Sequence, residues 1–194
     1  AEDGIRDYKV TGVQTCALPI LRDTTIPDEM DSIGSAVSEA LARVDLVFVS
    51  GGLGPTVDDI TRDALAKLLH QKIVLDQPTV EYLNEWYEKR GRALTLAATR
   101  QAQVLEKAVV LPNSVGAAPG QRIELPDEKT LFVMPGPPNE FNAILSEEIV
   151  PWLNVRYTGA RPKLVRIIQT KGIGESDIVT ILENAGFQIG RAHV

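Results

Sequence analysis

The chain has 194 residues, of which 44% are hydrophobic and 24% are charged. That composition suffices for a packed core and excludes a generally disordered chain. The net charge of −6 argues against a surface that binds nucleic acid, and the one cysteine excludes a disulfide framework and a cysteine zinc cluster. No apolar run is long enough to cross a membrane, so we expect a cytoplasmic chain without a membrane partner.

The two ends of the chain differ in character from the rest. Residues 1–20 lack hydrophobic periodicity, and residues 189–194 read IGRAHV. DNA of a sequencing-library adapter encodes IGRAHV, and its reverse complement encodes part of the first stretch. We therefore expect adapter-like artefacts at 1–20 and 189–194 around an insert cut from a longer gene, a natural tail of unusual composition being the alternative.

Hydrophobic periodicity along the insert predicts alternating helices and strands. We expect helices at residues 29–43, 59–70, 77–90, 92–105 and 138–149. We expect strands at residues 45–50, 108–111, 122–125 and 130–134. The continuous apolar run at 45–50 is typical of a strand buried on both faces, so the order of elements predicts an α/β fold with helices on both faces of a sheet.

A second module is expected after Pro151, where the pattern changes. Residues 163–170 alternate between apolar and polar side chains as a strand does. A glycine turn follows, and residues 175–185 have the pattern of a helix. These elements read as the first strand and helix of a further domain.

The most informative motif is SGGLGPTVDDIT at residues 50–61, directly after the buried strand. Glycines let the backbone approach a ligand, and free amides before a helix favour a phosphate. Asp58 and Asp59 are expected to open the next helix, where one aspartate is enough for a cap. The second aspartate points to a divalent cation that bridges ligand phosphates.

Two familiar phosphate-binding motifs do not fit this segment. A Walker A loop requires a lysine after the glycines, and none is present. A dinucleotide fingerprint requires a third glycine where Val57 stands, although Asp76 lies near the distance expected for a ribose contact. A nicotinamide-dependent oxidoreductase is therefore disfavoured.

Three further segments have both a structural and a functional interpretation. Asp28, in IPDE at residues 26–29, is either a helix cap or a second carboxylate for a metal or substrate. MPGPPNEF at 134–141 is either a rigid strand–helix turn or a ligand loop, and Glu140 suits the first helical turn in both cases. NSVGAAPG at 113–120 is either an ordinary turn or a loop that lines a ligand.

Taken in order, these motifs resemble the MoaB/Mog-like molybdopterin-binding domain, in the form found in CinA-like competence-damage-inducible proteins. The stretches that carry the resemblance are residues 50–61, 100–104 (RQAQV), 113–120, 134–141 and 171–176 (KGIGES). The resemblance implies a three-layer α/β/α sandwich at 21–153 that lacks the family's first strand and helix. It also implies that residues 154–188 begin a small α+β KH-like linker module.

The resemblance implies a function as well. This branch is similar to hydrolases of a nicotinamide-nucleotide recycling protein that cleave ADP-ribose to AMP and ribose 5-phosphate with a divalent metal such as Mg²⁺. The implied partner is a small nucleotide diphosphate, and a homo-oligomer is compatible with the family. The alternatives are a module that binds a molybdopterin-like ligand or a nucleotide without turnover, and an inactive gene fragment.

Site residues follow from the same resemblance. Asp59 matches the family's essential aspartate and is the expected catalytic residue and metal ligand. Asp28 matches a second aspartate and is the other expected catalytic residue, which would orient water or a second metal. The residues expected to contact the ligand are Ser50, Gly51, Gly52, Gly54, Pro55, Thr56, Asp58, Asn113, Gly136, Pro137, Pro138 and Glu140.

Overall fold

The computed structural model describes residues 21–158 and 171–186. The chain divides into two compact units, Ala1–Pro162 and Lys163–Val194. The expected artefacts at 1–20 and 189–194 and the expected strand at 163–170 lie outside the described residues, so they stay predictions.

The first unit is built on a four-stranded sheet with the order β1-β6-β5-β4. Its strands are β1 (Leu46–Ser50), β4 (Val109–Leu111), β5 (Gly120–Glu124) and β6 (Thr130–Met134). β1 and β6 are parallel, whereas β5 is antiparallel to both of its neighbours. The four strands expected from the sequence are confirmed, although β5 begins earlier than expected. The expectation that the strand at 45–50 is buried on both faces is wrong: β1 lies at the edge of the described sheet, and its Phe48 is 41% exposed.

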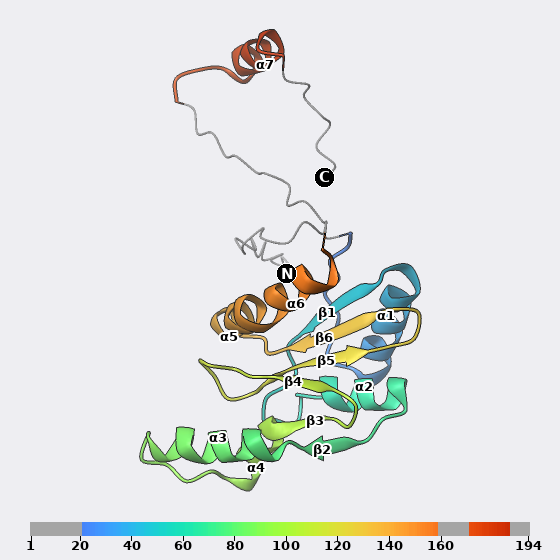
Figure 1. Ribbon diagram of the computed structural model, residues 1–194, viewed down its shortest axis with the longest axis vertical. Coiled ribbons are helices and arrows are strands. Elements are labelled where there is room, and N and C mark those ends of the chain that lie inside the picture. Colours follow the sequence, from blue (N-terminus) through green and yellow to red (C-terminus); the bar gives the residue numbers. More distant parts are fainter. Residues whose placement is uncertain (1–20, 159–170, 187–194) are drawn as a thin grey trace, which may run out of the picture. The chain divides into compact units, whose positions relative to one another are not determined.

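Helices cover both faces of this sheet (Figure 1). One face carries α1 (Met30–Arg43) and α2 (Thr61–Leu69). The other carries a continuous helical segment made of α5 (Pro138–Ile144), a π turn (Leu145–Ile149) and α6 (Val150–Arg156). The expected three-layer α/β/α sandwich is thus confirmed.

β6 shows why two helical layers are needed. All five of its residues are buried. Leu131 and Val133 belong to the apolar cluster under α1 and α2, whereas Phe132 and Met134 belong to the cluster under α5 and α6. Since successive side chains of a strand point to opposite faces, an uninterrupted apolar strand needs cover on both sides.

The helix expected at 138–149 runs further than the sequence suggested. Pro151 was expected to end the pattern, but it lies in the first turn of α6, which continues to Arg156. Because the helical segment is continuous, a residue at this position would normally donate its amide to the preceding turn, and proline removes that donor. The wider π turn at Leu145–Ile149 adjusts the hydrogen-bond ladder just before it.

A small lobe of the same unit consists of a second sheet and its helices. β2 (Ile73–Leu75) pairs antiparallel with β3 (Gln103–Leu105). Between them lie α3 (Gln77–Glu88), the short α4 (Leu96–Thr99) and a 3-10 turn, η1 (Arg100–Ala102). The helix expected at 77–90 is confirmed.

The helix expected at 92–105 is wrong for most of its length. Only Leu96–Thr99 is α-helical, and residues 103–105 form β3. Val104 and Leu105 are buried in pairing with β2, which the sequence analysis did not predict. The backbone pairing with a strand some 30 residues away in sequence overrides the helical spacing of the alanines and leucines.

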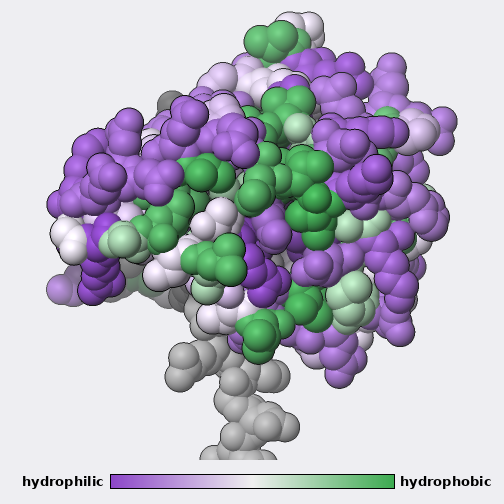
Figure 2. Space-filling view, turned by 90° about the horizontal axis from the view of Figure 1, so that it is seen from below, coloured by the Kyte–Doolittle hydropathy of each residue, from purple (hydrophilic) through white to green (hydrophobic). Residues whose placement is uncertain are grey.

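Figure 2 shows the face of the molecule on the side of this lobe, where hydrophobic side chains lie among hydrophilic ones. The lobe's own exposed apolar side chains are Val74, Leu75, Tyr82 and Leu96. A two-stranded sheet packed against α2 has one face without a helical layer, so apolar side chains stay in contact with solvent there.

The second unit contains one described helix, α7 (Glu175–Asn184), which confirms the helix expected at 175–185. Its assignment as the start of a KH-like module stays a prediction. Within the described ranges of both units, no helix is both long and apolar enough to span a membrane.

Candidate functional site

Two glycine-containing loops lie side by side at the carboxyl ends of β1 and β6. The strands are parallel and in register, so Ser50 lies opposite Met134. The amide of Gly51 donates to the Met134 carbonyl at 2.9 Å, and the Ser50 hydroxyl donates to the Pro135 carbonyl at 3.3 Å. A Cβ on Gly136 would lie 3.5 Å from the Cα of Gly51. The expectation that both loops sit at strand ends is confirmed, and such edges of α/β sheets bind ligands.

The first loop requires glycine at defined positions. Gly51 and Gly52 have φ of +103° and +67°, in the region that L side chains rarely adopt. A Cβ on Gly52 would collide with the hydroxyl of Thr61, and one on Gly54 would collide with the Asp59 carboxylate. The loop therefore folds tightly back on the start of α2.

Asp59 stabilises this loop and does not cap a helix. The sequence led us to expect Asp58 and Asp59 at the helix start, but α2 begins at Thr61 and its N-cap, Ile60, makes no side-chain cap bond. The Asp59 carboxylate accepts hydrogen bonds from the Thr56 amide at 2.9 Å and from the Thr56 hydroxyl. Aspartate forms such local turns because its short side chain reaches the nearby backbone.

The surroundings of Asp59 favour its ionised form. Burial opposes the charge, but the hydroxyl and amide of Thr56, the amide of Gly54 and the charge of Arg62 together outweigh it and hold the pKa of Asp59 below its usual value. Hydrogen bonds to a carboxylate lower its pKa because they stabilise the charged form. Asp59 is therefore a half-exposed anion at neutral pH.

Arg62, in the first turn of α2, holds the glycine loop in place through its side chain. The sequence analysis did not identify this residue. Its side chain is 1% exposed and donates to the carbonyls of Leu53 at 2.7 Å and Gly54 at 3.0 Å. Burial lowers the pKa of Arg62 to about 10, with the charge of Arg100 acting in the same direction. No local pattern marks Arg62, since its neighbours in the sequence are a threonine and an aspartate.

Arg100 reaches the same loop from the small lobe. Its Nη1 donates to the Thr56 carbonyl at 3.2 Å, and its Nη2 lies 3.8 Å from a carboxylate oxygen of Asp63. The RQAQV stretch that begins at Arg100 contributed to the family resemblance, but no role was predicted for it. In the structure, this stretch places the positively charged Arg100 side chain at the glycine loop.

The third loop brings together two predicted site residues. The side-chain amide of the buried Asn113 donates to Glu140 at 2.6 Å and to the carbonyl of Ala118 at 2.8 Å. The Tyr82 hydroxyl donates to the Gly116 carbonyl at 3.0 Å. Asn113 and Glu140 therefore hold the loop against the first turn of α5.

This third loop lies at the same edge of the sheet as the other two. β5 follows the loop and runs antiparallel to β6, with Gln121 opposite Val133. The start of β5 thus lies beside the end of β6. Three loops from four strands meet at one edge, an arrangement that the sequence analysis left open.

Other predicted residues have structural roles or few contacts. Pro137 is the N-cap of α5 and Pro138 its first residue, as expected for a rigid strand–helix turn, and their contact with a ligand stays a prediction. Asp28 is exposed and does not cap α1, because Glu29 occupies the N-cap position. No hydrogen bond within the described residues joins Asp28 to Asp59, and Asp58 is exposed as well.

The donors present fit a divalent cation only together with a ligand. Within residues 21–158 and 171–186, no three His, Cys, Asp or Glu side chains gather as a metal-binding group. At the loop, Asp59 supplies an ionised carboxylate. Mg²⁺ is commonly held by one or two carboxylates together with substrate phosphates, so a diphosphate would have to complete this shell.

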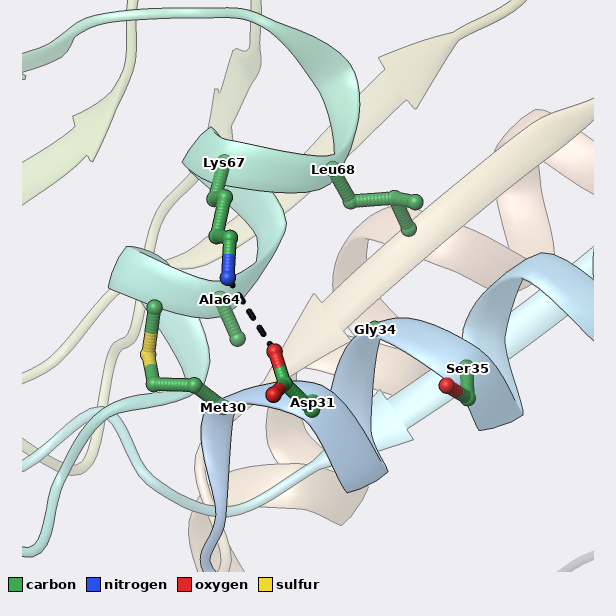
Figure 3. A pocket seen from close by; sticks show the side chains of 7 residues that line it. All are labelled: Met30, Asp31, Gly34, Ser35, Ala64, Lys67 and Leu68. Atoms are coloured by element: carbon green, nitrogen blue, oxygen red, sulfur yellow. Dashed lines mark hydrogen bonds and ion pairs between the residues drawn. The ribbon is translucent and has the colours of Figure 1, made fainter.

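A separate open groove lies between α1 and α2 and has a volume of about 260 Å³. Figure 3 shows its lining, in which Lys67 forms a 3.1 Å ion pair with Asp31. The remaining lining residues are Met30, Gly34, Ser35, Ala64 and Leu68. No predicted site residue lines it, so the candidate site is the loop edge and not this groove.

Known proteins resemble this chain over most of its length. The family model described as "Probable molybdopterin binding domain" matches residues 12–155. A protein of Desulforamulus reducens named "Putative competence-damage inducible protein" is 36% identical over 170 residues, 86% of this chain and 40% of that protein. A CinA-like protein of Deinococcus deserti is 36% identical over 165 residues, 85% of this chain and 40% of that protein.

A solved structure supports the same relationship. The protein CinA of unknown function from Thermoplasma acidophilum is 34% identical, with a TM-score of 0.56 over 63% of this chain and 73% of that one. The chain spans about 40% of the length of the two curated relatives above. From the family match, the three-layer fold and the three loops at one sheet edge, we conclude that the chain belongs to the MoaB/Mog-type family of molybdopterin-binding domains, in its CinA-like form.

Proposed function

We propose that the three loops bind a nucleotide diphosphate and that this domain, with a divalent cation, hydrolyses ADP-ribose to AMP and ribose 5-phosphate. The observation that carries the proposal is the position of an ionised Asp59 inside a glycine loop that lies beside a second loop at the ends of parallel strands. Such strand ends are where open α/β sheets bind nucleotides.

The reaction requires the chain to hold the diphosphate and to offset its charge. The glycine loop lets the backbone approach the phosphates, and Asn113 and Glu140 shape the opposite wall. Asp59 would hold a divalent cation, which withdraws charge from the phosphorus that is attacked. The oxygen of a water molecule bonds to one phosphorus while the bond from that phosphorus to the bridging oxygen breaks. The bridging oxygen leaves with the other phosphate, and the attacking water releases its proton to solvent.

Asp28 is not included in this proposal. The sequence led us to expect a carboxylate that orients water, but Asp28 is exposed at the start of α1 and has no described contact with Asp59. Among the carboxylates of the described residues, Asp59 is the one whose hydrogen bonds both fix its position and favour its charge.

The test is release of AMP from ADP-ribose by the full chain, with and without Mg²⁺. We expect metal-dependent release that falls about a hundredfold or more in Asp59→Asn, because the neutral amide neither holds a cation nor keeps the charge. Asp31→Asn is the matched control, since Asp31 is exposed and pairs with Lys67 away from the loops. Unchanged metal-dependent hydrolysis in Asp59→Asn would show that the assignment is wrong.

A second candidate is a module that binds a molybdopterin-like ligand or a nucleotide without turnover. It is favoured by the match of residues 12–155 to the family model described as "Probable molybdopterin binding domain". Calorimetry with ADP-ribose separates the two functions: heat of binding with no AMP released supports the binding module, whereas AMP release supports the hydrolase.

A further inference from the structure

The guanidinium group of Arg100 lies at the glycine loop but has no role in the function proposed above. Arg100 comes from η1 in the small lobe, 44 residues along the chain from Thr56, whose carbonyl it contacts at 3.2 Å. Its side chain is 33% exposed. It is therefore both anchored at the loop and accessible to a ligand there.

Arg62 and Arg100 share the loop but differ in how fully they are engaged. Arg62 is buried and donates to two loop carbonyls at 2.7 and 3.0 Å, so its role is structural. Arg100 makes one hydrogen bond of 3.2 Å and one ion pair of 3.8 Å to Asp63. A guanidinium has five N–H donors in a planar fork, so Arg100 retains donors for a ligand.

The negative charges around the glycine loop favour a positively charged side chain such as Arg100 beside the ligand. A diphosphate would bring negative charge next to the ionised Asp59 and near Asp63. Arg62 is committed to backbone carbonyls, and the nearby Arg100 adds a second positive charge that depresses the pKa of Arg62. An anion bound at Arg100 would offset the repulsion between the two guanidinium groups.

We propose that Arg100 binds a phosphate of the ligand, and this inference rests on the diphosphate site proposed above. Arg100 would exchange its weak contacts with Thr56 and Asp63 for two hydrogen bonds to oxygens of one phosphate. Arginine suits this role because its fork matches two oxygens of one phosphate, whereas lysine offers a point charge. The small lobe thereby supplies the cation that determines selectivity for phosphorylated ligands.

The experiment is calorimetric titration of the full chain with ADP-ribose and with inorganic pyrophosphate, each at two salt concentrations. The variants are Arg100→Gln and Arg100→Lys. The matched control is Arg90→Gln in the same lobe, because Arg90 lies 3.5 Å over the ring of Trp86 and does not contact the loop. Melting temperatures establish that each variant is folded.

We expect Arg100→Gln to weaken both ligands about tenfold or more and to make the remaining affinity less sensitive to salt. Arg100→Lys should lie between wild type and Arg100→Gln, and Arg90→Gln should bind as wild type does. A merely structural role would not change the salt dependence. If Arg100→Gln should fail to fold, the folded Arg100→Lys must still bind pyrophosphate more weakly than wild type.

Two negative outcomes are distinguishable. If Arg100→Gln binds with the affinity and salt dependence of wild type, the role of Arg100 is overturned and the diphosphate site stays in place. The same holds for Arg100→Lys where only that variant folds. Failure of the wild-type chain to bind either ligand would overturn the diphosphate site itself, and the role of Arg100 with it.

Discussion

Gly52 shows how strongly a single position is constrained by its backbone and its neighbour. Its φ is +67°, and a Cβ there would meet the hydroxyl of Thr61 in α2. A larger residue would be strained in conformation and also crowded. The constraint comes from the tight fold of the loop, which holds the candidate ligand site against α2.

We predict that Gly52→Ala lowers the free energy of unfolding by about 1–3 kcal/mol, since both the backbone and Thr61 must adjust. Gly34→Ala is the matched control: Gly34 lies within α1, and a Cβ there would meet no atom within 4 Å. It should raise stability by about 0.5–1 kcal/mol. Urea denaturation measures both, and effects of the same sign would contradict this account.

Asp59 should make stability depend on pH. Its pKa in the folded chain lies below the ordinary value of 3.8, so its stabilising contribution is present above that pH and is lost as the pH falls through the folded pKa. Wild type should therefore be more stable than Asp59→Asn at about pH 6, and the difference should shrink toward about pH 3.

Denaturation of both proteins across this pH range measures the effect. Thr56→Val removes one hydroxyl donor to Asp59 and leaves the amide, so it should weaken the same pH dependence. A difference between wild type and Asp59→Asn that is constant with pH would contradict the hydrogen-bonded turn as its cause.

At the scale of whole elements, two helices differ in whether a side chain caps their first turn. Asp76, which we had weighed as a ribose contact, is the N-cap of α3, and its carboxylate accepts from the Thr79 amide at 3.0 Å and the Thr79 hydroxyl at 2.6 Å. Glu29 occupies the N-cap position of α1 without a side-chain cap bond. The two helices thus begin with different chemistry.

Asp76→Ala should cost about 1 kcal/mol of unfolding free energy, the usual value of an aspartate cap. Glu29→Ala should cost far less, because no helix amide loses a partner. Chemical denaturation compares them, and equal losses would show that the Asp76 cap contributes nothing specific.

At the scale of the whole first unit, one strand joins the two helical layers. Phe132 of β6 is fully buried and stacks on Phe48 at 4.9 Å, and its edge meets Trp152 of α6 at 5.5 Å. Its neighbours along the strand pack under α1 and α2. Loosening this strand should affect both layers together.

Phe132→Ala should therefore cost about 3–5 kcal/mol and still give a single transition for the first unit. Phe48→Ala is the comparison, since Phe48 is 41% exposed and should cost clearly less. Differential scanning calorimetry and near-UV circular dichroism measure the two effects. Separate transitions for the two helical layers would contradict a shared core.

Much of this fold could be predicted from the sequence because its signals are local. The apolar run of β1, the spacing of α1 and the glycines after β1 each reflect the chain's own periodicity and backbone freedom. These features placed two loops at strand ends and pointed to the pair Asp58 and Asp59, whereas the choice of Asp59 within that pair came from the family resemblance. The three layers were expected from a strand at 45–50 buried on both faces, but the strand that is buried throughout is β6, and β1 is partly exposed.

Tertiary structure alone decided how these parts are used. Residues 103–105 became a strand because β2 pairs with them across some 30 residues of chain. Arg62 and Arg100 joined the site through contacts that no local pattern encodes, the latter across 44 residues of chain. Sequence periodicity reports which face of an element is apolar, whereas the partners of a buried or charged group depend on which distant segments the fold brings against it.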